Sequence, residues 1–590
     1  MKWNKWIVFL VSVCLLCTGC SYSSTQVTVP KEEKIQLTKT QKEFDDFLEE
    51  QMIETLTADY YTLHSYVEDP EALGIDESTV EKTFGRMDEA SMEDNRLEIQ
   101  ETLDELQTFD KEDLTSSQQD TYDAFLFNME VSQKLSDPKF DYLSSEFSPT
   151  NGIHVSFPMI FSDWELYSQK DVENLILMIE DVDDYTQSAI DYTWKQNEMG
   201  TMCIDFDSVI SYCQQILEQG NESSSLNTLI KRVKELSLDT NLEKEYISRI
   251  QKAFNDSYLR SYQMILEAMT ELEEKGENHP TGLANLPNGK EYYTYLMQSN
   301  TGRIQSVEDV EEKMNEAYQD HIFSFYNNYE ETMDLFDMKT SYTSYEEILE
   351  DVKEQMFEDF PTISSLDYEI RDMEEDIATD NGMAAYYQIP TLDGNQKGQL
   401  RVNPHNNDIS SVDTFMTVCH EGMPGHMYQY NYLHEATSQK IRWSLLRSIA
   451  YQEGYATYAE HYSLKYLKDI PQKTLKAYSS YSMFLYDALI LADIGIHYYG
   501  WDIDTCNENL EMYGINLIQE QYDQLLYDAC IFEPYYVGAY EFFTLQKKAQ
   551  EKLGHSYDDR EFHQAILSAG SLPFEIVERH VEDYISAQKK

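Results

Sequence analysis

The stretch TVCHEGMPGH, residues 417–426, places His420 next to Glu421 and puts His426 six residues after His420. In the common HExxH arrangement, two histidines four residues apart share one helical face and bind zinc, and the glutamate activates a water. On a regular helix a spacing of six residues corresponds to a rotation of about 600°, or about 240° beyond one turn. On such a helix the two histidines would diverge.

The residues between the two histidines predict an interruption of the helix that would bring the histidines together. Pro424 and Gly425 lie directly before His426. Proline breaks the hydrogen-bond ladder of a helix, and glycine lets the chain turn tightly. A local bulge at this point would bring His426 back onto the face of His420. We therefore take His420 and His426 as candidate metal ligands.

A second acidic motif, YQEGYATYAE at residues 451–460, follows the histidines. Glu453 and Glu460 are seven residues apart, so they share one face of a helix. Alanine and tyrosine flank them, and a carboxylate on such a half-apolar face needs a partner or a metal. A solvated acidic stripe is the alternative in so acidic a chain. Two histidines and one carboxylate would leave the fourth position of Zn²⁺ open for water.

Composition limits the class of protein. The chain has 590 residues, with 108 Asp and Glu against 44 Lys and Arg, a formal net charge of −64. This charge excludes a nucleic-acid binder, because phosphates would be repelled. The 41% hydrophobic content excludes wholesale disorder, and the scarcity of Gly (22) and Pro (14) favours a mostly helical chain. The acidity indicates a solubilising surface or, alternatively, a preference for cationic substrates.

Hydrophobic periodicity places these motifs in a helical framework. Residues 41–275 show apolar positions at helical spacing, and a loop rich in Gly and Pro follows at residues 276–289. The segment AAYYQIPTLDGNQKGQLRVN, residues 384–403, predicts a β-hairpin around its Asp-Gly turn signal. Helices are expected again from about residue 411. We predict one large domain over residues 41–590 with a central cleft, and two lobes divided by that cleft as the alternative.

The N-terminal sequence predicts that the protein is exported from the cytoplasm. Lys2 and Lys5 precede an apolar run over residues 6–17, which is too short to span a bilayer and suits a signal peptide. The following Thr-Gly-Cys resembles the lipobox of bacterial lipoproteins, with Cys17 where leucine is usual. The resemblance implies a signal peptide over residues 1–19, lipidation of Cys20 and a polar tether over residues 20–40. A plain secretory signal is the alternative.

Several motifs together resemble the bacterial family called domain of unknown function 885 (DUF885), whose members show HExxPGH followed by EGWAxYAE. The resemblance covers about residues 41–590. In this chain Tyr455 replaces the usual Trp, Met427 replaces a frequent second His, and Tyr535-Tyr536 replaces a Gly-Gln pair. The matching segments are HEGMPGH, EGYATYAE, the 384–403 hairpin, ALILADIGIHYYGW (488–501), EPYYVGAYEF (533–542) and FHQAILSAGSLPFEIV (562–577).

The family is similar to helical zincin metallopeptidases of the oligopeptidase and carboxypeptidase type. That similarity implies a mostly helical shell around a deep cleft, with a small sheet beside a metal. His420, His426 and Glu453 would be the Zn²⁺ ligands. Glu421 would be the general base that takes a proton from the activated water and passes it to the leaving amine.

The same resemblance names candidates for the supporting roles. Tyr540, and after it His497, would donate to the oxyanion of the tetrahedral intermediate. Glu460 or Asp493 would orient a ligand histidine. The edge of the hairpin would bind substrate backbone by strand addition. The alternatives are that Tyr540 is one of 45 tyrosines without a catalytic role and that His497 is a structural hydrogen-bonding residue.

These expectations combine into a lipid-anchored zinc peptidase that acts on short peptides at the cell surface. Retention of Glu421 argues against the first alternative, a non-catalytic peptide-binding lipoprotein on a peptidase scaffold. The second alternative is a metal-dependent hydrolase of a non-peptide amide or ester. The cleavage mode, the side-chain preference, the identity of the divalent ion and the oligomeric state stay open.

Overall fold

The structure is a computed structural model, and it describes residues 29, 36–330, 335–366, 368–374, 378, 384–393, 397–406 and 408–589. Cys20, the signal peptide and most of the tether lie outside these residues. The first helices are α1 (Lys39–Thr57), α2 (Tyr60–Tyr66), α3 (Glu89–Leu106), α4 (Ser116–Leu135), α5 (Ile153–Ser162), α6 (Gln169–Met199), α7 (Phe206–Gln219), α8 (Ser224–Glu235), α9 (Thr240–Ala253), α10 (Leu259–Lys275) and α11 (Gly289–Thr301).

The second half of the chain is also built mainly from helices. The mostly helical class is therefore confirmed. These helices are α12 (Val307–Asn328), α13 (Tyr345–Met356), α14 (Val412–Glu421), α15 (His426–Ala436), α16 (Ile441–Ser444), α17 (Ile449–Ser463), α18 (Gln472–Ile494), α19 (Ile503–Leu510), α20 (Gln519–Tyr527), α21 (Glu533–Leu553), α22 (Asp559–Ala569) and α23 (Phe574–Gln588).

Helix α6 illustrates why these segments are helical. Its N-cap Ser168 and Asp171 form a capping box, which satisfies backbone N–H groups that a helix start leaves free. The helix ends at Gly200, whose φ of 71° suits glycine. The buried apolar side chains recur at three and four residues and form one stripe against the core: Val172, Leu175, Ile176, Ile179 and Val182.

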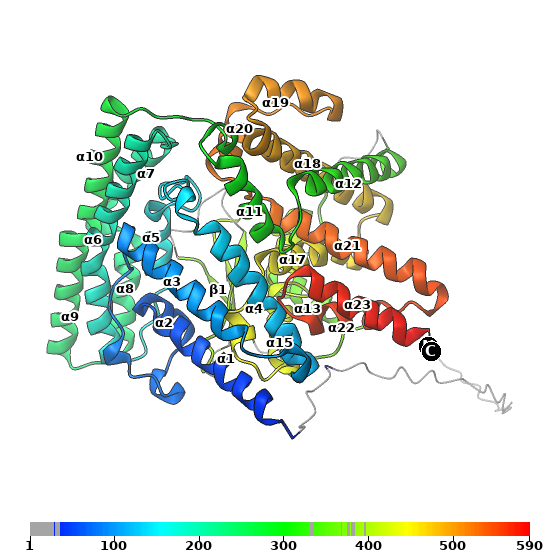
Figure 1. The fold of residues 1–590 in the computed structure, drawn as a ribbon, viewed down its shortest axis with the longest axis horizontal. Coiled ribbons are helices and arrows are strands. Elements are labelled where there is room, and N and C mark those ends of the chain that lie inside the picture. Colours follow the sequence, from blue (N-terminus) through cyan, green and yellow to red (C-terminus); the bar gives the residue numbers. More distant parts are fainter. Residues whose placement is uncertain are drawn as a thin grey trace, which may run out of the picture.

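Two large hydrophobic cores hold the molecule together. One lies among α1 to α10, and the other lies among α13, α14, α17, α21, α22 and α23. Figure 1 shows α6 to α10 on one side of the molecule and α12, α18, α21 and α23 on the other, with β1 and α15 near the middle. Burial of these apolar faces is the main source of stability. The centre of the molecule, between the two groups of helices, is where the site described below lies.

A small sheet lies beside α14. The expected hairpin is confirmed: β2 (Ala385–Gln388) pairs antiparallel with β3 (Gly398–Val402), with Tyr387 opposite Leu400. A strand that the sequence did not indicate, β1 (Tyr368–Asp372), pairs parallel with β3, so the strand order is β1-β3-β2. All residues of β3 are buried. β2 is consequently an edge strand, and it contacts α14.

Helices α17 and α21 cross at unusually short range. A Cβ on Gly454 of α17 would lie 2.4 Å from the Cα of Gly538 on α21, so both positions require the absence of a side chain. The close crossing fixes α21 against the helix that carries Glu453 and Glu460. Among the described residues, no helix is both long and apolar enough to cross a bilayer.

Candidate functional site: a histidine–glutamate cluster

The chain leaves α14 at Glu421 and starts α15 at His426. The expected bulge within one helix is instead a break between two helices, with a cis peptide bond between Met423 and Pro424. The Gly425 N–H donates to the Cys419 carbonyl over 2.9 Å. A Cβ on Gly425 would lie 1.9 Å from the His420 carbonyl oxygen, so only glycine fits this return of the chain. The break makes His426 the first residue of a new helix.

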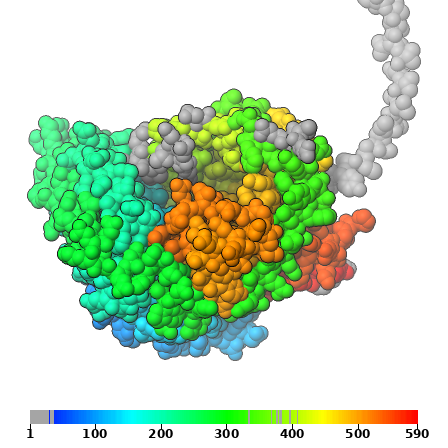
Figure 2. Space-filling model, turned by 90° about the horizontal axis from the view of Figure 1, so that it is seen from above, coloured from blue at the N-terminus to red at the C-terminus, as the bar shows by residue number. Residues whose placement is uncertain are grey.

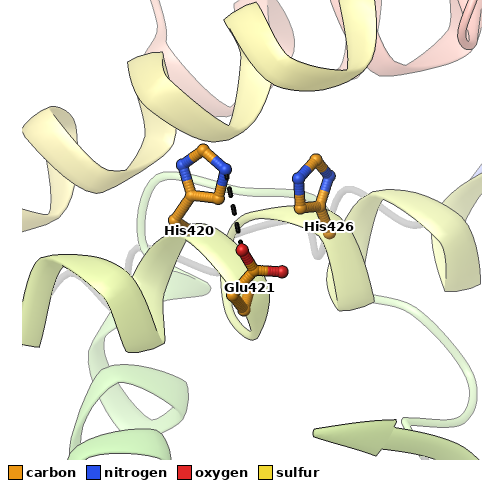
Figure 3. A group of neighbouring side chains, drawn as sticks. All are labelled: His420, Glu421 and His426. Carbon is orange, nitrogen blue, oxygen red and sulfur yellow. Dashed lines mark ion pairs between the residues drawn. The ribbon is translucent and has the colours of Figure 1, made fainter. Parts of the chain in front are cut away.

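Both histidines consequently point to the same side (Figure 3). Their ring centroids lie 4.8 Å apart. The Nε2 atoms of His420 and of His426 each lie 3.4 Å from Oε2 of Glu453, which reaches them from α17. Three potential ligand atoms from three helices therefore meet at one point.

These separations can be compared with those around a zinc ion. Ligand atoms held at about 2.0–2.2 Å from one tetrahedral zinc lie about 3.3–3.5 Å from each other. The two measured distances of 3.4 Å between imidazole nitrogen and carboxylate oxygen agree with this spacing. Imidazole and carboxylate are also ligand types that zinc accepts. The residues present thus fit a zinc ion without rearrangement of the helices.

Two further glutamates support the cluster. Oε2 of Glu460 lies 3.1 Å from Nδ1 of His420, the ring nitrogen that faces away from Glu453. A carboxylate in this position fixes the tautomer and the orientation of a ligand histidine. Glu421 is held differently, because its Oε2 accepts the backbone N–H of Tyr387 in β2 over 2.9 Å. Its Oε1 lies 3.9 Å from Nε2 of His420.

Burial and charge shift the ionisation of the cluster. Burial alone would lower the pKa of His420, but its contacts with Glu453 and Glu460 outweigh this and raise it well above its usual value. Burial opposes ionisation of Glu453, yet the two histidines hold the pKa of its carboxyl well below its usual range. Burial raises the pKa of Glu421, and the histidines only partly offset that effect. Of these two carboxyls, Glu421 is therefore the one that accepts a proton more readily.

Three tyrosines at helical spacing anchor α17. Tyr451, Tyr455 and Tyr458 are fully buried. The Tyr455 hydroxyl donates to the Pro424 carbonyl over 2.9 Å, and the Tyr451 hydroxyl donates to the Ile566 carbonyl over 2.7 Å. The first of these bonds ties the helix that carries Glu453 to the break that positions His426. Tyrosine at position 455 thus links the two motifs of the sequence physically.

Tyr535 is a site residue that sequence reasoning missed. Its ring stacks on His420 with centroids 6.3 Å apart and an interplanar angle of 22°. Burial, reinforced by the charges of Glu453 and Glu421, raises its pKa, so the hydroxyl stays protonated and able to donate. The only sequence signal was the replacement of Gly-Gln by two tyrosines at the start of α21.

Tyr540 and His497, the residues expected to stabilise an oxyanion, lie elsewhere. Tyr540 is half-buried in a separate apolar cluster, and after burial the nearby carboxylates of Glu316, Glu541 and Asp320 raise its pKa. The Nδ1 of His497 accepts the Leu283 N–H over 3.2 Å, and its Nε2 lies 2.8 Å from the Leu525 carbonyl. Both ring nitrogens of His497 are therefore engaged with the backbone.

Asp493 is separate from His420 and His426 and lies instead 3.7 Å from Nε2 of His497. It accepts the Tyr293 hydroxyl over 2.6 Å and the Cys530 N–H at 3.3 Å, and it lies close to the buried Glu533. Of the two residues expected to orient a ligand histidine, the structure brings Glu460 to His420 and places Asp493 in this second cluster.

One cavity is lined by the histidine–glutamate cluster, and two further cavities share other lining residues with it. The first, of about 300 Å³, is lined by His420, Glu421, His426 and Glu453. A second, of about 770 Å³, shares part of β2 with it, and a third, of about 530 Å³, shares Tyr535. Figure 2 shows a hollow in which yellow-green residues lie behind the orange helices. The expected cleft beside the sheet is thus present as a branched space.

Fold and site together define a mostly helical protein whose cleft contains a cluster of two histidines and three glutamates. Residues 69–581 match the family described as bacterial protein of unknown function, DUF885, and the chain belongs to this family. The resemblance inferred from the motifs is thereby confirmed. No curated protein matches the sequence.

Two solved structures share the fold. One is that of a proposed lipoprotein from Colwellia psychrerythraea, with a TM-score of 0.75 and 15% identity over 93% of this chain and 100% of that chain. The other is that of a proposed lipoprotein of unknown function from Shewanella oneidensis, with a TM-score of 0.63 and 13% identity over 91% and 98% of the two chains. At these identities the likeness concerns the fold alone.

Proposed function

We propose that this chain is a zinc-dependent hydrolase of peptide bonds in short peptides. The observation that carries the proposal is the convergence of two imidazole nitrogens on one carboxylate oxygen, each at 3.4 Å, with Glu421 at their side. The cluster lines a cavity, so substrate can reach it. A purely structural cluster would not need an additional buried carboxyl that faces the same cavity.

His420, His426 and Glu453 would hold the ion. When bound, zinc supplies positive charge that lowers the pKa of a water and polarises the scissile carbonyl. Glu460 keeps His420 in the tautomer whose Nε2 is free to bind metal. These residues position the reactive centre, and the proton transfers fall to Glu421.

Glu421 takes the proton of the attacking water and delivers it to the nitrogen of the leaving amine. The Tyr387 N–H holds its Oε2, so the second oxygen stays directed toward the cluster. Its raised pKa suits a group that gains and then loses a proton within one cycle. Tyr535, protonated and stacked on His420, donates a hydrogen bond from its hydroxyl to the oxyanion that develops at the carbonyl.

The shape of the cleft supports short peptides as substrates. The cluster lies among helices in cavities of a few hundred cubic ångströms, which a folded protein cannot enter. Tyr386, Tyr387 and Ile389, in and just after β2, line two of the cavities. Along this edge strand a peptide in extended conformation can add its own backbone hydrogen bonds.

The proposal includes a place at the outer face of the cell membrane, through a lipid on Cys20. Its support is the signal-like sequence of residues 1–20 and the likeness to two solved structures that are themselves described as proposed lipoproteins. Peptides outside the cytoplasm would then be the substrates.

Metal analysis and peptide digestion of four variants test the proposal. We expect purified protein to hold roughly one zinc per chain. His420→Ala loses the metal, whereas Glu421→Gln keeps it and loses hydrolysis of a mixed short-peptide library by about 100-fold or more. His555→Ala, an exposed histidine far along the chain, is the control and keeps both.

Full zinc occupancy in a His420→Ala/His426→Ala double variant would overturn the ligand assignment. Absence of peptide cleavage by zinc-loaded protein would instead favour a peptide-binding lipoprotein or a hydrolase of non-peptide amides or esters.

A further inference from the structure

Arg447 lies where two cavities of the cleft meet. It belongs to the short connection between α16 and α17, and its side chain is exposed. It lines both the cavity that contains the histidines and the larger cavity beyond β2. Among the described residues that line the three connected cavities, it is the only lysine or arginine.

No ion pair or hydrogen bond engages the Arg447 guanidinium within the described part of the chain. This is unusual in a protein with 108 acidic against 44 basic residues. By contrast, the arginines that lie near the same cleft have partners, because Arg232 and Arg401 both contact Glu165, at 3.4 and 3.5 Å. Arg447 is therefore a cation held available at the rim of the cavity.

The two cavities that Arg447 lines provide no comparable anion for a peptide amine among the described residues. Apart from the histidine–glutamate cluster, Arg447 is the only described charged residue that lines the first cavity. In the neighbouring cavity, Asp163 accepts the Tyr386 hydroxyl over 2.9 Å, and Glu165 is paired with the two arginines. In the third cavity, burial raises the pKa of the Asp528 carboxyl, and its Oδ1 accepts the Ser148 hydroxyl. Among the described residues that line the two cavities shared by Arg447, Arg447 is thus the charged side chain outside the cluster that has neither a hydrogen bond nor an ion pair.

The backbone that carries Arg447 is firmly placed relative to the cluster. The next residue, Ser448, caps α17 with its side chain, and its N–H donates to the Ser571 carbonyl over 2.7 Å. Glu453 lies on the first turns of the same helix, six residues after Arg447. The cluster and Arg447 line one and the same cavity of about 300 Å³. A peptide whose scissile bond lies at the cluster can therefore reach the guanidinium within this cavity.

On the basis of the proposed function, we propose that Arg447 binds the C-terminal carboxylate of the substrate. A guanidinium and a carboxylate form two parallel charge-assisted hydrogen bonds, which fix direction as well as position. The peptide bond at the cluster is then one close to the C-terminus. The chain is accordingly a carboxypeptidase-type enzyme that removes short C-terminal pieces, and Ile389, Leu433 and Trp443 provide apolar contacts in the same cavity.

Paired substrates test this inference directly. One short peptide is offered with a free C-terminal carboxylate and, in parallel, as its C-terminal amide. For the wild type we expect kcat/KM to be about 10- to 100-fold higher for the free acid. Arg447→Gln loses this preference through a higher KM, Arg447→Lys retains part of it, and hydrolysis of the amide changes little. Lys476→Gln, which removes an exposed positive charge outside the cavities, is the matched control.

A binding measurement separates this inference from the proposed function. In the zinc-loaded Glu421→Gln variant, the free-acid peptide binds about 10- to 100-fold tighter than the amide, and the additional Arg447→Gln substitution abolishes the difference. If neither peptide is hydrolysed by the wild type but this binding preference is present, the hydrolase proposal fails and carboxylate recognition stands. If both peptides are hydrolysed equally and Arg447→Gln changes nothing, the assignment of Arg447 is overturned while the hydrolase proposal survives.

Discussion

Tyr535 and Tyr540 show how strongly the chemistry depends on single positions. They are five residues apart on α21, which corresponds to about 500° of rotation, or about 140° beyond one turn. They therefore point to different neighbours: Tyr535 to His420, and Tyr540 to the separate apolar cluster that α21 shares with α12. A choice of tyrosine based on the motif alone thus selects a residue on a different side of the helix from the one that faces His420.

Replacement of Tyr535 by Phe tests its assignment as the oxyanion donor. We expect kcat to fall by about 100- to 1000-fold, because a preorganised donor is lost while the ring and its stacking remain. Zinc content should be unchanged. Tyr540→Phe is the matched control and should stay within about twofold of wild type in kcat. A large loss in Tyr540→Phe with none in Tyr535→Phe would reverse the assignment.

At the scale of elements, two places fix helix α21: its first residue, Glu533, and its close crossing with α17. Glu533 begins the helix and is completely buried, and neither of its carboxylate oxygens has a hydrogen-bond partner among the described residues. Burial first, and then the neighbouring Asp493, raises the pKa of Glu533 well above its usual value. A neutral Glu533 therefore allows α21 to start beside Asp493, and Tyr535 lies two residues further on.

The raised pKa of Glu533 has a consequence for stability. The folded state binds this proton more tightly than the unfolded state, whose carboxyl has the ordinary pKa of 4.5. The contribution of Glu533 to stability is thus fully present below pH 4.5 and is lost as the pH rises toward the folded pKa.

Melting temperatures measured from pH 5.5 to 8.5 test this linkage. Wild type should lose melting temperature relative to Glu533→Gln as the pH rises, since an amide stays neutral throughout. Glu551→Gln, an exposed glutamate on the same helix, should run parallel to wild type. A constant difference between wild type and Glu533→Gln over this range would show that Glu533 does not titrate on unfolding.

At the scale of the whole molecule, the chain carries a net charge of −64. Among the described residues that line the cleft, Arg447 is the one unpaired cation. A long-range negative field attracts cationic peptides, whereas a local guanidinium acts only on a carboxylate that has already entered. The two effects are compatible, because they act over different distances. Salt screens the long-range field, whereas the guanidinium acts only at hydrogen-bond distance.

Ionic strength separates these two contributions. The Debye length falls from about 30 Å at 0.01 M salt to about 8 Å at 0.15 M. We expect kcat/KM for peptides of net positive charge to fall over this range, and that for neutral peptides of equal length to change little. Equal salt dependence for both peptide types would assign the acidity to solubility alone.

The sequence by itself determined the features that depend on near neighbours. Scarce Gly and Pro and apolar side chains at helical spacing indicate the helices, and two short runs on either side of an Asp-Gly turn signal indicate the β2–β3 hairpin. The spacing of seven residues indicates that Glu453 and Glu460 share a helical face. Such features are local, because the geometry of a helix or a hairpin follows from a few consecutive residues.

Tertiary structure alone decided which faces meet. Local periodicity says nothing about the partner of a face, so it does not reveal that β1 joins β3, that Tyr535 covers His420, or that Asp493 lies close to Glu533. The same holds for Arg447, because only the fold shows that its guanidinium has no partner among the described residues. These arrangements result from burial of apolar faces between segments that are far apart in the chain. The hydrophobic effect is non-directional, so a single face does not specify which other face covers it.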